Sequence, residues 1–572
     1  MPNPDNPVAA ERPGARALGS PTLSGLSLAL LFWWQALTPT LIPRSWTVQA
    51  VISAVCFAIG YGIGTLVGRW VHWLLDRESR APGPVTRRLS WIVLGVGWLI
   101  CVPLGAVLWV GWQNEQRNFM GMTPIDWFDV VLTVPLSVVA GAALVVIGRA
   151  IANGVGAINR FSHRHVPAVL AGPAAVLLTV VLSIVLGGAA FRALTALANS
   201  HYGSVNESTH EGIVVPDSPS VSGSSDSFVA WDTLGRHGRD FVASATTAQE
   251  LAMFHGTDAA LAEPVRVYVG VHSAHSATER AELAVRELER AGGFDRQVLA
   301  VWVPTGSGWM VREAAEALEQ LYRGDTAIVA VQYSYLSSLL SAILDAGLAA
   351  EAGSTLFSAV RAHWSGLPPE RRPKLVLFGK SLGTAGVEAP FVGVDASASV
   401  ANLVARTDGA LIAGAPYSNP ILAQLTRERE PGSPVWQPIF ARGRSARFVN
   451  RDPRQPVLNP HWPAPRIVYL QHPSDPATYW DVAALWWPPE WMDHPRGYDV
   501  PDAARWFPIV SGVQAVADLV FQLSPPAGFG HVYWTDYVTG WAQVVPPDGW
   551  TDADTARLEQ FLHNGGAGES EP

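Results

Sequence analysis

One serine flanked by glycines is the residue in this 572-residue chain whose type and spacing point most directly to chemistry. The pentapeptide GKSLG, residues 379–383, is the only G-x-S-x-G in the sequence, and it follows the apolar run KLVLF at 374–378. In this pattern a serine lies in a tight turn between a strand and a helix, with its hydroxyl exposed. Small residues at 382–389 suit the helix. The spacing therefore predicts Ser381 as a nucleophile.

A serine hydroxyl attacks a carbonyl near neutral pH only when a base removes its proton and a carboxylate orients that base. In the strand–turn–helix arrangement these partners follow in the order acid, then histidine. Asp475 lies just after the apolar run RIVYLQ at 466–471, and His531 lies 56 residues later in the glycine-rich stretch GFGHVYW. We expect Asp475 and His531 to complete the site.

Other acids and histidines occupy the same stretch of sequence. The competing residues are Asp452, Asp481 and Asp493 as acids and His461, His472 and His494 as bases. None of these acids directly follows a convincing strand, and each histidine precedes or nearly coincides with the position of the acid. We therefore favour the first pair.

Acyl transfer also requires backbone amides that stabilise the negatively charged oxygen of the tetrahedral intermediate. The amide of Leu382, directly after the nucleophile, is expected to be one donor. The second is expected from the loop PTGSG, at Gly306, Ser307 or Gly308. The loop VHSAHSA at 271–277 is the alternative source.

Apolar runs and amphipathic segments alternate through the C-terminal part of the chain, which we place at 231–572. Strands are expected at 265–271, 298–303, 327–333, 374–378 and 466–471, and helices at 277–291, at 311–322 and up to about 363. Short buried strands that alternate with helices predict a doubly wound, mainly parallel sheet covered on both faces.

The N-terminal part contains five charge-poor apolar stretches, at 23–42, 48–75, 90–112, 127–148 and 167–191. Each is long enough for a membrane-spanning helix, which needs about 20 residues. We therefore expect a flexible arm at 1–22, a transmembrane domain of about five helices at 23–200 and a mobile linker at 201–230. No span carries a pair of charges typical of proton relays, so the region is interpreted as an anchor.

Arginine placement predicts the orientation of these spans. The N-terminal arm, the second loop and the fourth loop hold nine arginines, whereas the first and third loops hold only Arg44 and Arg117. Positive residues mark the cytoplasmic side. The N-terminus is therefore expected inside the cell, and the C-terminal domain outside the plasma membrane.

Composition excludes several classes of protein. Hydrophobic residues make up 49% of the chain and charged residues 15%, which is unlike a disordered protein or an ordinary soluble enzyme. The first 200 residues carry a net charge of +6 and the remainder −15, so nucleic acid is not an expected partner. The only cysteines, Cys56 and Cys101, lie in apolar runs, and we expect neither a cofactor nor a metal.

These features resemble those of the actinobacterial membrane-anchored α/β-hydrolases, which join a multi-spanning region to a hydrolase domain. The resemblance rests on GKSLG, PTGSGW, QYSYLSS, the SDP around Asp475 and the GH at His531. It implies a serine hydrolase whose physiological substrate is unassigned. One departure from the general fold is that no clear strand lies between the helix expected at about 510–523 and His531.

The expected activity is therefore a serine esterase or lipase-like hydrolase that acts on acyl esters of envelope lipids. The alternatives are an acyltransferase that uses the same three residues, a non-catalytic envelope protein and a lipid transporter. Two further features are interpreted structurally, Lys380 as a solvated charge at the rim of the site and a tryptophan cluster as core packing rather than as a lid or membrane-resting surface. The cluster comprises Trp462, Trp480, Trp486, Trp487 and Trp491.

Overall fold

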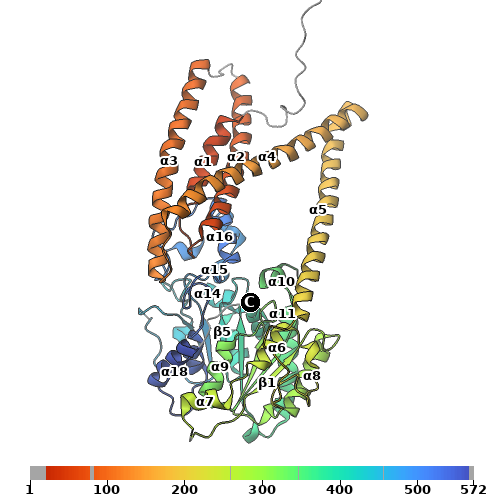
Figure 1. Cartoon of the computed structure of the whole chain (residues 1–572), viewed down its shortest axis with the longest axis vertical. Coiled ribbons are helices and arrows are strands. Elements are labelled where there is room, and N and C mark those ends of the chain that lie inside the picture. The colour runs from red at the N-terminus through yellow and green to blue at the C-terminus, as the bar shows by residue number, and fades with distance from the viewer. Residues whose placement is uncertain (1–20, 78–82, 258, 345–346, 455, 566–572) are drawn as a thin grey trace, which may run out of the picture.

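The structure is a computed structural model that describes residues 21–77, 83–257, 259–344, 347–454 and 456–565 (Figure 1). A group of long helices from the N-terminal part lies at one end of the molecule, and an α/β domain lies at the other. The N-terminal helices are α1 (Leu23–Gln35), α2 (Trp46–Arg77), α3 (Pro84–Phe119), α4 (Trp127–His165) and α5 (Ala168–Glu207).

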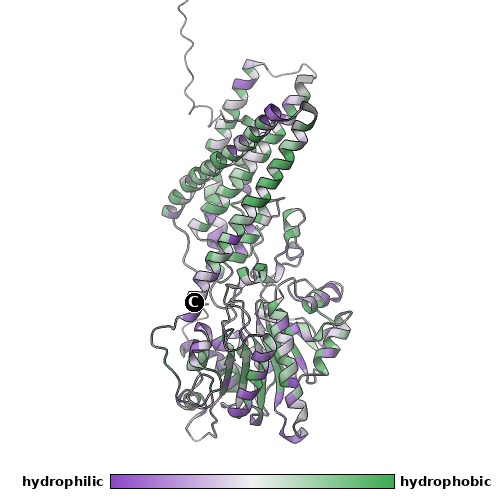
Figure 2. Ribbon diagram, turned by 90° about the vertical axis from the view of Figure 1, so that its right-hand side faces the viewer, coloured by the Kyte–Doolittle hydropathy of each residue, from purple (hydrophilic) through white to green (hydrophobic). Residues whose placement is uncertain are grey.

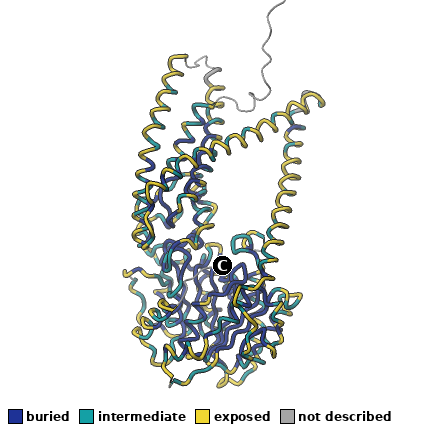
Figure 3. Tube along the Cα trace, viewed as in Figure 1, coloured by how far each residue is buried: buried dark blue, intermediate teal, exposed yellow. Residues whose placement is uncertain are grey.

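Four of these helices are long and apolar enough to cross a membrane. Their apolar parts are Trp46–Leu74, Pro84–Phe119, Trp127–His165 and Gly172–Glu207. Hydrophobic residues run along their length in Figure 2, and Figure 3 shows that much of α3 and α5 is exposed. Apolar side chains that face outward along a whole helix are those expected in contact with lipid. A multi-pass membrane region follows.

The first expected span, 23–42, is helical only in part. Helix α1 ends at Gln35 after 13 residues, about 20 Å of helix, whereas a membrane core is about 30 Å thick. Pro39 and Pro43 lie in the continuation, and proline lacks the N–H that an α-helix needs. Residues 36–44 leave the helix and are buried. Of the five apolar stretches expected to span the membrane, four correspond to long apolar helices, and the first corresponds to the short helix α1 with the buried segment 36–44.

Helix α1 packs closely along α2. A Cβ at Gly64 would lie 2.3 Å from the carbonyl oxygen of Ser24, and the hydroxyls of Thr22 and Thr65 are 2.9 Å apart. Small residues permit this approach of two helix backbones, as is common in membrane helix packing. The side of α1 that faces α2 is thereby fixed.

The α/β domain contains a seven-stranded sheet in which all neighbouring strands are parallel. The strand order is β1-β3-β2-β4-β5-β7-β6. The strands are β1 (Val265–Val269), β2 (Val298–Val303), β3 (Thr326–Val331), β4 (Lys374–Lys380), β5 (Gly409–Ala413), β6 (Ala446–Val449) and β7 (Arg466–Leu470). The five expected strands correspond to β1, β2, β3, β4 and β7, whereas β5 and β6 were not expected.

Helices cover both faces of the sheet, as predicted for a doubly wound domain. Helices α8, α11 and α12 pack on one face, and α9 and α17 pack on the other with α18 beside them. The helices of this domain are α6 (Arg236–Ala243), α7 (Ala248–His255), α8 (Ala277–Arg290), α9 (Arg312–Leu321), α10 (Ser338–Leu344), α11 (Leu348–Gly366), α12 (Gly383–Glu388), α13 (Ala396–Val404), α14 (Pro420–Arg427), α15 (Pro476–Tyr479), α16 (Val510–Val520), α17 (Asp536–Val544) and α18 (Asp552–Gly565).

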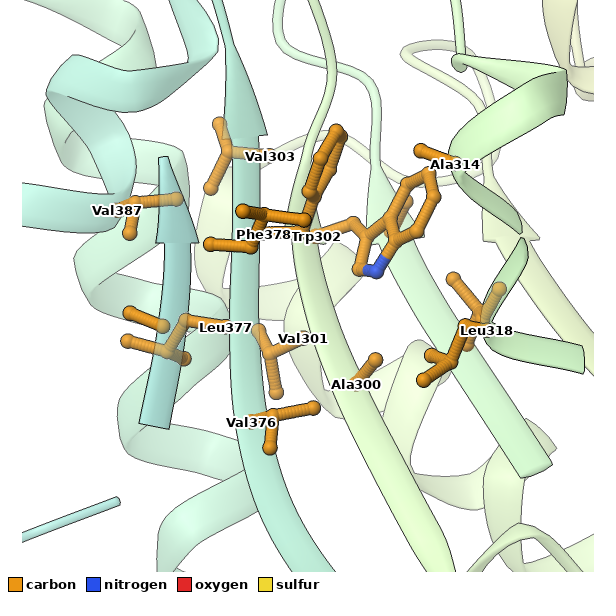
Figure 4. Close-up of a cluster of buried hydrophobic side chains, with 14 of the residues drawn as sticks. Ala300, Val301, Trp302, Val303, Ala314, Leu318, Val376, Leu377, Phe378 and Val387 are labelled. Atoms are coloured by element: carbon orange, nitrogen blue, oxygen red, sulfur yellow. The ribbon is translucent and has the colours of Figure 1, made fainter. Parts of the chain in front are cut away.

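Part of the hydrophobic core lies around β2 and β4, which run side by side (Figure 4). Val301 and Leu377 are paired across the two strands and are almost fully buried. The rings of Trp302 and Phe378 lie 4.2 Å apart on the same face. Buried β-branched and aromatic residues stabilise such central strands. This packing fixes the end of β4, from which the candidate nucleophile projects.

Residues 220–224, within the mobile linker expected at 201–230, are instead buried against the α/β domain. Helix α5 continues to Glu207, and Val221 forms a parallel bridge with Arg266 of β1. The amide of Ser222 donates to the carbonyl of Arg266 at 3.0 Å. The hydroxyls of Ser222 and Ser227 donate to the carboxylate of Glu287 in α8, so serines of this polar stretch bind the α/β domain.

The carboxyl end of the sheet faces the N-terminal helices, and α14, α15 and α16 lie between the two (Figure 1). Leu41 and Ile42, between α1 and α2, form a buried cluster with Tyr479 at the end of α15. Phe119 at the end of α3 contacts Phe529 of the α/β domain. The first and third loops of the helical region therefore lie on the same side as the α/β domain.

Candidate active site

Ser381 occupies a sharp turn between β4 and α12. Its φ angle is +52°, in the left-handed region that non-glycine residues rarely adopt. The amide of Ser381 donates to the carbonyl of Ala413 at 3.0 Å, and the hydroxyl of Thr384 donates to the carbonyl of Ser381 at 2.6 Å. Strained conformations of this kind cost about 1–3 kcal/mol and are typical of functional sites. The turn holds the serine at the end of the strand.

The glycines on either side of the turn are required by close approach. A Cβ at Gly383 would lie 2.2 Å from the carbonyl oxygen of Val303, at the end of the neighbouring strand β2. A Cβ at Gly379 would lie 2.8 Å from Val387 of α12. Any other residue at either position would force the strand and helix apart. The spacing of the G-x-S-x-G pattern thus follows from the packing around Ser381.

Asp475 and His531 form a hydrogen-bonded pair at the carboxyl end of β7. The Nδ1 of His531 lies 2.8 Å from Oδ2 of Asp475, and the amide of Ala477 donates to Oδ1 at 2.9 Å. Both side chains are almost fully buried. The carboxylate fixes the ring and favours the tautomer with its proton on Nδ1. The Nε2 of His531 is buried and has no hydrogen-bond partner among the described residues.

The environment of Asp475 favours its ionised form. Burial alone would raise its pKa, but His531, the hydroxyl of Tyr533 and the amide of Ala477 together hold the pKa below its ordinary value. Asp475 therefore remains a carboxylate that can stabilise a positive charge on His531.

The end of β5 brings the serine and the histidine to the same corner of the domain. The carbonyl of Ala413 binds the amide of Ser381, and the next residue, Gly414, lies against the ring of His531. A Cβ at Gly414 would lie 2.5 Å from Cε1 of the ring. Glycine also permits the φ of +56° found there. One short segment thus contacts both the nucleophile turn and the candidate base.

Comparison with known families gives two matches. The family described as "Alpha/beta-hydrolase family" matches residues 265–558, slightly more than half of the chain. The family described as "Alpha/beta-hydrolase family N-terminus" matches residues 37–245, which include α2 to α5. The chain belongs to the alpha/beta-hydrolase family. No curated protein and no solved structure shows a significant match to it.

The loop between β2 and α9 of the hydrolase lies beside the nucleophile turn, because β2 is the direct neighbour of β4. The alternative loop, 271–277, follows β1, which is separated from β4 by two strands. The amide of Gly306 donates to Oγ of Ser338 at 3.2 Å, and the amide of Gly308 donates to the carbonyl of Thr305 at 3.0 Å. The amide of Gly308 is therefore engaged within the loop, and that of Gly306 is engaged by the first residue of α10.

Ser307 and Leu382 are the other two residues expected near the oxyanion. Ser307 is buried in the same loop, with its hydroxyl 3.2 Å from that of Thr305. Leu382 directly precedes α12 as its N-cap residue, so its amide lies at the helix N-terminus. The roles of Leu382, Gly306 and Ser307 as oxyanion donors stay predictions.

The competing acids and histidines have other partners or are exposed. Asp452 pairs with Arg454 at 2.9 Å, and Asp481 accepts a hydrogen bond from the amide of Ala483. The remaining candidates are exposed at the surface, and they are Asp493, His461 and His494. The structure therefore brings Asp475 and His531 together and leaves these five residues elsewhere.

His472 supports the loop that carries His531. Its Nδ1 bonds the carbonyl of Gly530 at 2.9 Å, and its Nε2 lies 2.8 Å from Asp536. The hydroxyl of Ser474 accepts from the amide of Gly530 at 2.9 Å. Burial lowers the pKa of His472, but Asp536, the carbonyl of Gly530 and the charge of Asp499 together raise it above its ordinary value. Sequence reasoning missed this role, although HPSDP places His472 and Ser474 directly before Asp475.

Two structural interpretations need revision. Lys380 is only 2% exposed, with its Nζ 4.9 Å from the centre of the Trp309 ring, so it is not a solvated rim charge. It is buried because both faces of the central strand β4 are covered. The tryptophan cluster divides into a buried pair, Trp462 and Trp491, and three exposed members with 36%, 58% and 71% exposure, Trp480, Trp486 and Trp487.

Proposed function

We propose that this protein is a membrane-anchored serine hydrolase that cleaves acyl esters. The observation that carries the proposal is the buried Asp475–His531 pair, 2.8 Å apart, whose free Nε2 lies at the corner where the strained turn presents Ser381. A nucleophile, a base and an orienting acid are the three parts that this chemistry requires.

The reaction proceeds through an acyl-enzyme. Oγ of Ser381 attacks the ester carbonyl while Nε2 of His531 accepts the hydroxyl proton, and Asp475 stabilises the imidazolium. The C–O bond of the ester then breaks, and His531 returns the proton to the departing alcohol. A water molecule, deprotonated by His531, then attacks the acyl-enzyme, and His531 returns the proton to Oγ of Ser381 as the bond to the acyl group breaks and the carboxylic acid leaves. The amide of Leu382 is the proposed donor to the oxyanion.

The proposed substrate is an acyl ester of a lipid in the membrane that the protein spans. Apolar side chains are exposed on the segment between Asp475 and His531, close to the spanning helices. They comprise Trp480, Val482, Trp486 and Trp487 before α16 and Val516, Val520, Phe521 and Leu523 on and after it. Exposed tryptophans are favoured at the membrane–water interface. On such a surface, the acyl chain of a membrane lipid can move from the bilayer towards Ser381 while it stays in contact with apolar side chains.

The proposed location of the hydrolase domain is outside the cytoplasm. The first loop and the end of α3 contact this domain, whereas the arginine-bearing end of α2, start of α3 and end of α4 lie at the opposite end. A reporter enzyme that is active only outside the cytoplasm, fused after residue 207, should be active in cells. Activity of a cytoplasm-specific reporter at the same position would contradict this orientation.

A fluorophosphonate probe tests the activity on the purified full-length protein. The probe should label the wild type and should not label Ser381→Ala, whereas Ser358→Ala, which alters an exposed serine of α11, should be labelled normally. Labelling that persists in Ser381→Ala, or a folded wild type that is not labelled, would refute the proposal. Product analysis distinguishes release of a free acid from transfer of the acyl group to another lipid.

A further inference from the structure

The segment between α1 and α2 joins the membrane helices to the hydrolase domain through buried polar contacts. Residues 36–44 are not helical, so their carbonyls need other donors. Gln514 of α16 supplies Nε2 to the carbonyls of Ala36 and Thr38, at 3.2 and 3.1 Å. Nε2 of Gln116 in α3 donates to the carbonyls of residues 40 and 41, at 3.1 and 3.0 Å. Helix α16 thus serves as a hydrogen-bonding partner of the membrane region.

A buried ion pair lies at the centre of this junction. Nε of Arg44 is 3.4 Å from Oδ1 of Asp518 in α16, and each side chain is 2% exposed. The hydroxyl of Thr40 donates to the same oxygen at 2.9 Å. A carboxylate is stable in such a place only when it is paired and hydrogen-bonded. The position of α16 is therefore defined by residues that precede it by more than 470 positions in the sequence.

Helix α16 leads directly into the loop that carries His531. The amide of His531 donates to the carbonyl of Gln522, two residues beyond the end of α16, at 3.2 Å. On the other side of the loop, Phe529 packs edge-to-face on Phe119 of α3, with ring centres 5.9 Å apart. The loop that carries His531 therefore contacts two elements. One is α16, whose position is held by contacts with the membrane region, and the other is α3, which is part of that region.

We infer that Asp518 and Phe119 are positioning residues for His531, so that the membrane helices form part of the catalytic unit and do more than anchor it. This inference rests on the proposed function of Ser381 and His531. Small displacements of a general base reduce catalysis steeply, because proton transfer requires hydrogen-bond distance. A loosened junction thus lowers the rate of serine attack while the binding of a small soluble ester is retained.

The test uses full-length protein in detergent micelles with a short-chain p-nitrophenyl ester, which does not require the membrane surface. Phe119→Ala removes the contact with Phe529, and Phe128→Ala removes a comparably exposed ring at the start of α4 as the matched control. Asp518→Asn removes the charge at the junction and keeps its shape. For Phe119→Ala and Asp518→Asn we expect kcat and the rate of fluorophosphonate labelling to fall about tenfold or more, with KM little changed.

The outcomes separate the two proposals. If the wild type is labelled at Ser381 and folded Phe119→Ala matches Phe128→Ala in kcat, the positioning role is refuted and the proposed function stands. Should Asp518→Asn fail to fold, Phe119→Ala decides the question alone, because its side chain is more than half exposed. A wild type that the probe does not label refutes the proposed function, and the positioning role with it.

Discussion

Tyr533 donates its phenolic hydroxyl to the same oxygen of Asp475 that binds His531. The hydroxyl lies 2.7 Å from Oδ2 and the histidine Nδ1 lies 2.8 Å from it. The ring of Tyr533 also stacks on His472, with centres 4.2 Å apart. Tyr533 therefore links the two histidines of the site, one that is the proposed base and one that supports its loop.

Tyr533→Phe should change the pH dependence of the reaction. A hydrogen bond to a carboxylate favours the charged form, so its loss raises the pKa of Asp475. Asp475 then takes up a proton at a higher pH, and the acidic limb of kcat/KM moves upward in pH. A hydrogen bond to a charged group contributes about 1.5–3 kcal/mol, so kcat/KM should fall about tenfold or more.

The control for this variant is Tyr322→Phe, which removes another buried phenol hydroxyl, one that donates to the carbonyl of Val545 at 3.0 Å. Its pH–rate profile should match that of the wild type. Equal profiles for both variants would show that the hydroxyl of Tyr533 does not act on Asp475.

Gly414→Ala should abolish activity by displacing His531. The new Cβ would lie 2.5 Å from Cε1 and 2.8 Å from Nδ1 of the ring. Because a 1 Å misplacement reduces rates about a hundredfold, the loss should be of that order or larger. Gly432→Ala is the matched control, since Gly432 has a φ of +86° and open space around its Cα. It introduces a similar backbone strain, about 1 kcal/mol, with no clash. Similar hydrolysis rates for the two variants would contradict the prediction.

Glu388 should make stability depend on pH. Burial raises its pKa from 4.5 to about 7, although the amide of Ile421 and the hydroxyl of Tyr469 bind the carboxylate. The folded state therefore binds more protons than the unfolded state between these values, and stability falls as the pH rises through this window. The ionised form costs roughly 3 kcal/mol of folding free energy above pH 7.

Glu388→Gln removes this titration. We expect the difference in Tm between Glu388→Gln and wild type, measured by thermal unfolding in detergent, to be more positive at pH 8 than at pH 5. Glu370→Gln, at an exposed position, should show no such trend. A constant difference between Glu388→Gln and wild type across this range would show that Glu388 is not protonated in the folded protein.

We expect Trp486 and Trp487 to increase the rate of hydrolysis of esters in membranes but not of soluble esters. Both are more than half exposed and precede Pro488 and Pro489 in the segment that follows Asp475. The double variant Trp486→Ala/Trp487→Ala removes indole groups that favour the membrane interface. Hydrolysis of an ester in lipid vesicles should fall about tenfold, since each indole adds a kcal/mol or so of interfacial binding. Hydrolysis of a short soluble ester should not change, and equal losses on both substrates would contradict an interfacial role.

Two parts of the site could be predicted from the sequence, one from a local motif after an apolar run and one from the order of an acid and a histidine along the chain. KLVLF followed by GKSLG predicts the nucleophile turn, and an acid after a buried strand followed by a histidine predicts the Asp475–His531 pair. Strand β5, GALIA, was missed because its alanines and glycine have low strand propensity, yet it is fully buried at the centre of the sheet. Its last residue, Ala413, binds the amide of Ser381, and the next residue, Gly414, lies against the ring of His531.

Contacts between distant parts of the chain could not be predicted in this way. The Arg44–Asp518 pair joins residues that belong to different domains, and an arginine in an apolar region was interpreted only through membrane orientation. Pro39 did carry a local signal for the end of α1, but the hydrophobicity of the surrounding stretch favoured a continuous span. Burial and pairing of single polar groups depend on tertiary structure, and a single sequence does not contain that information in a local form.

The bridge between Val221 and Arg266 has a consequence for how the protein behaves at high concentration. Strand β1 is a terminal strand of the sheet, and without this segment its outward amides and carbonyls would be free to pair with another molecule. The amide and carbonyl of Arg266 are instead occupied by residues 220 and 222. The segment that follows α5 thus shields this edge of the sheet from pairing with the same edge of another molecule, an encounter that becomes frequent when molecules share one membrane plane.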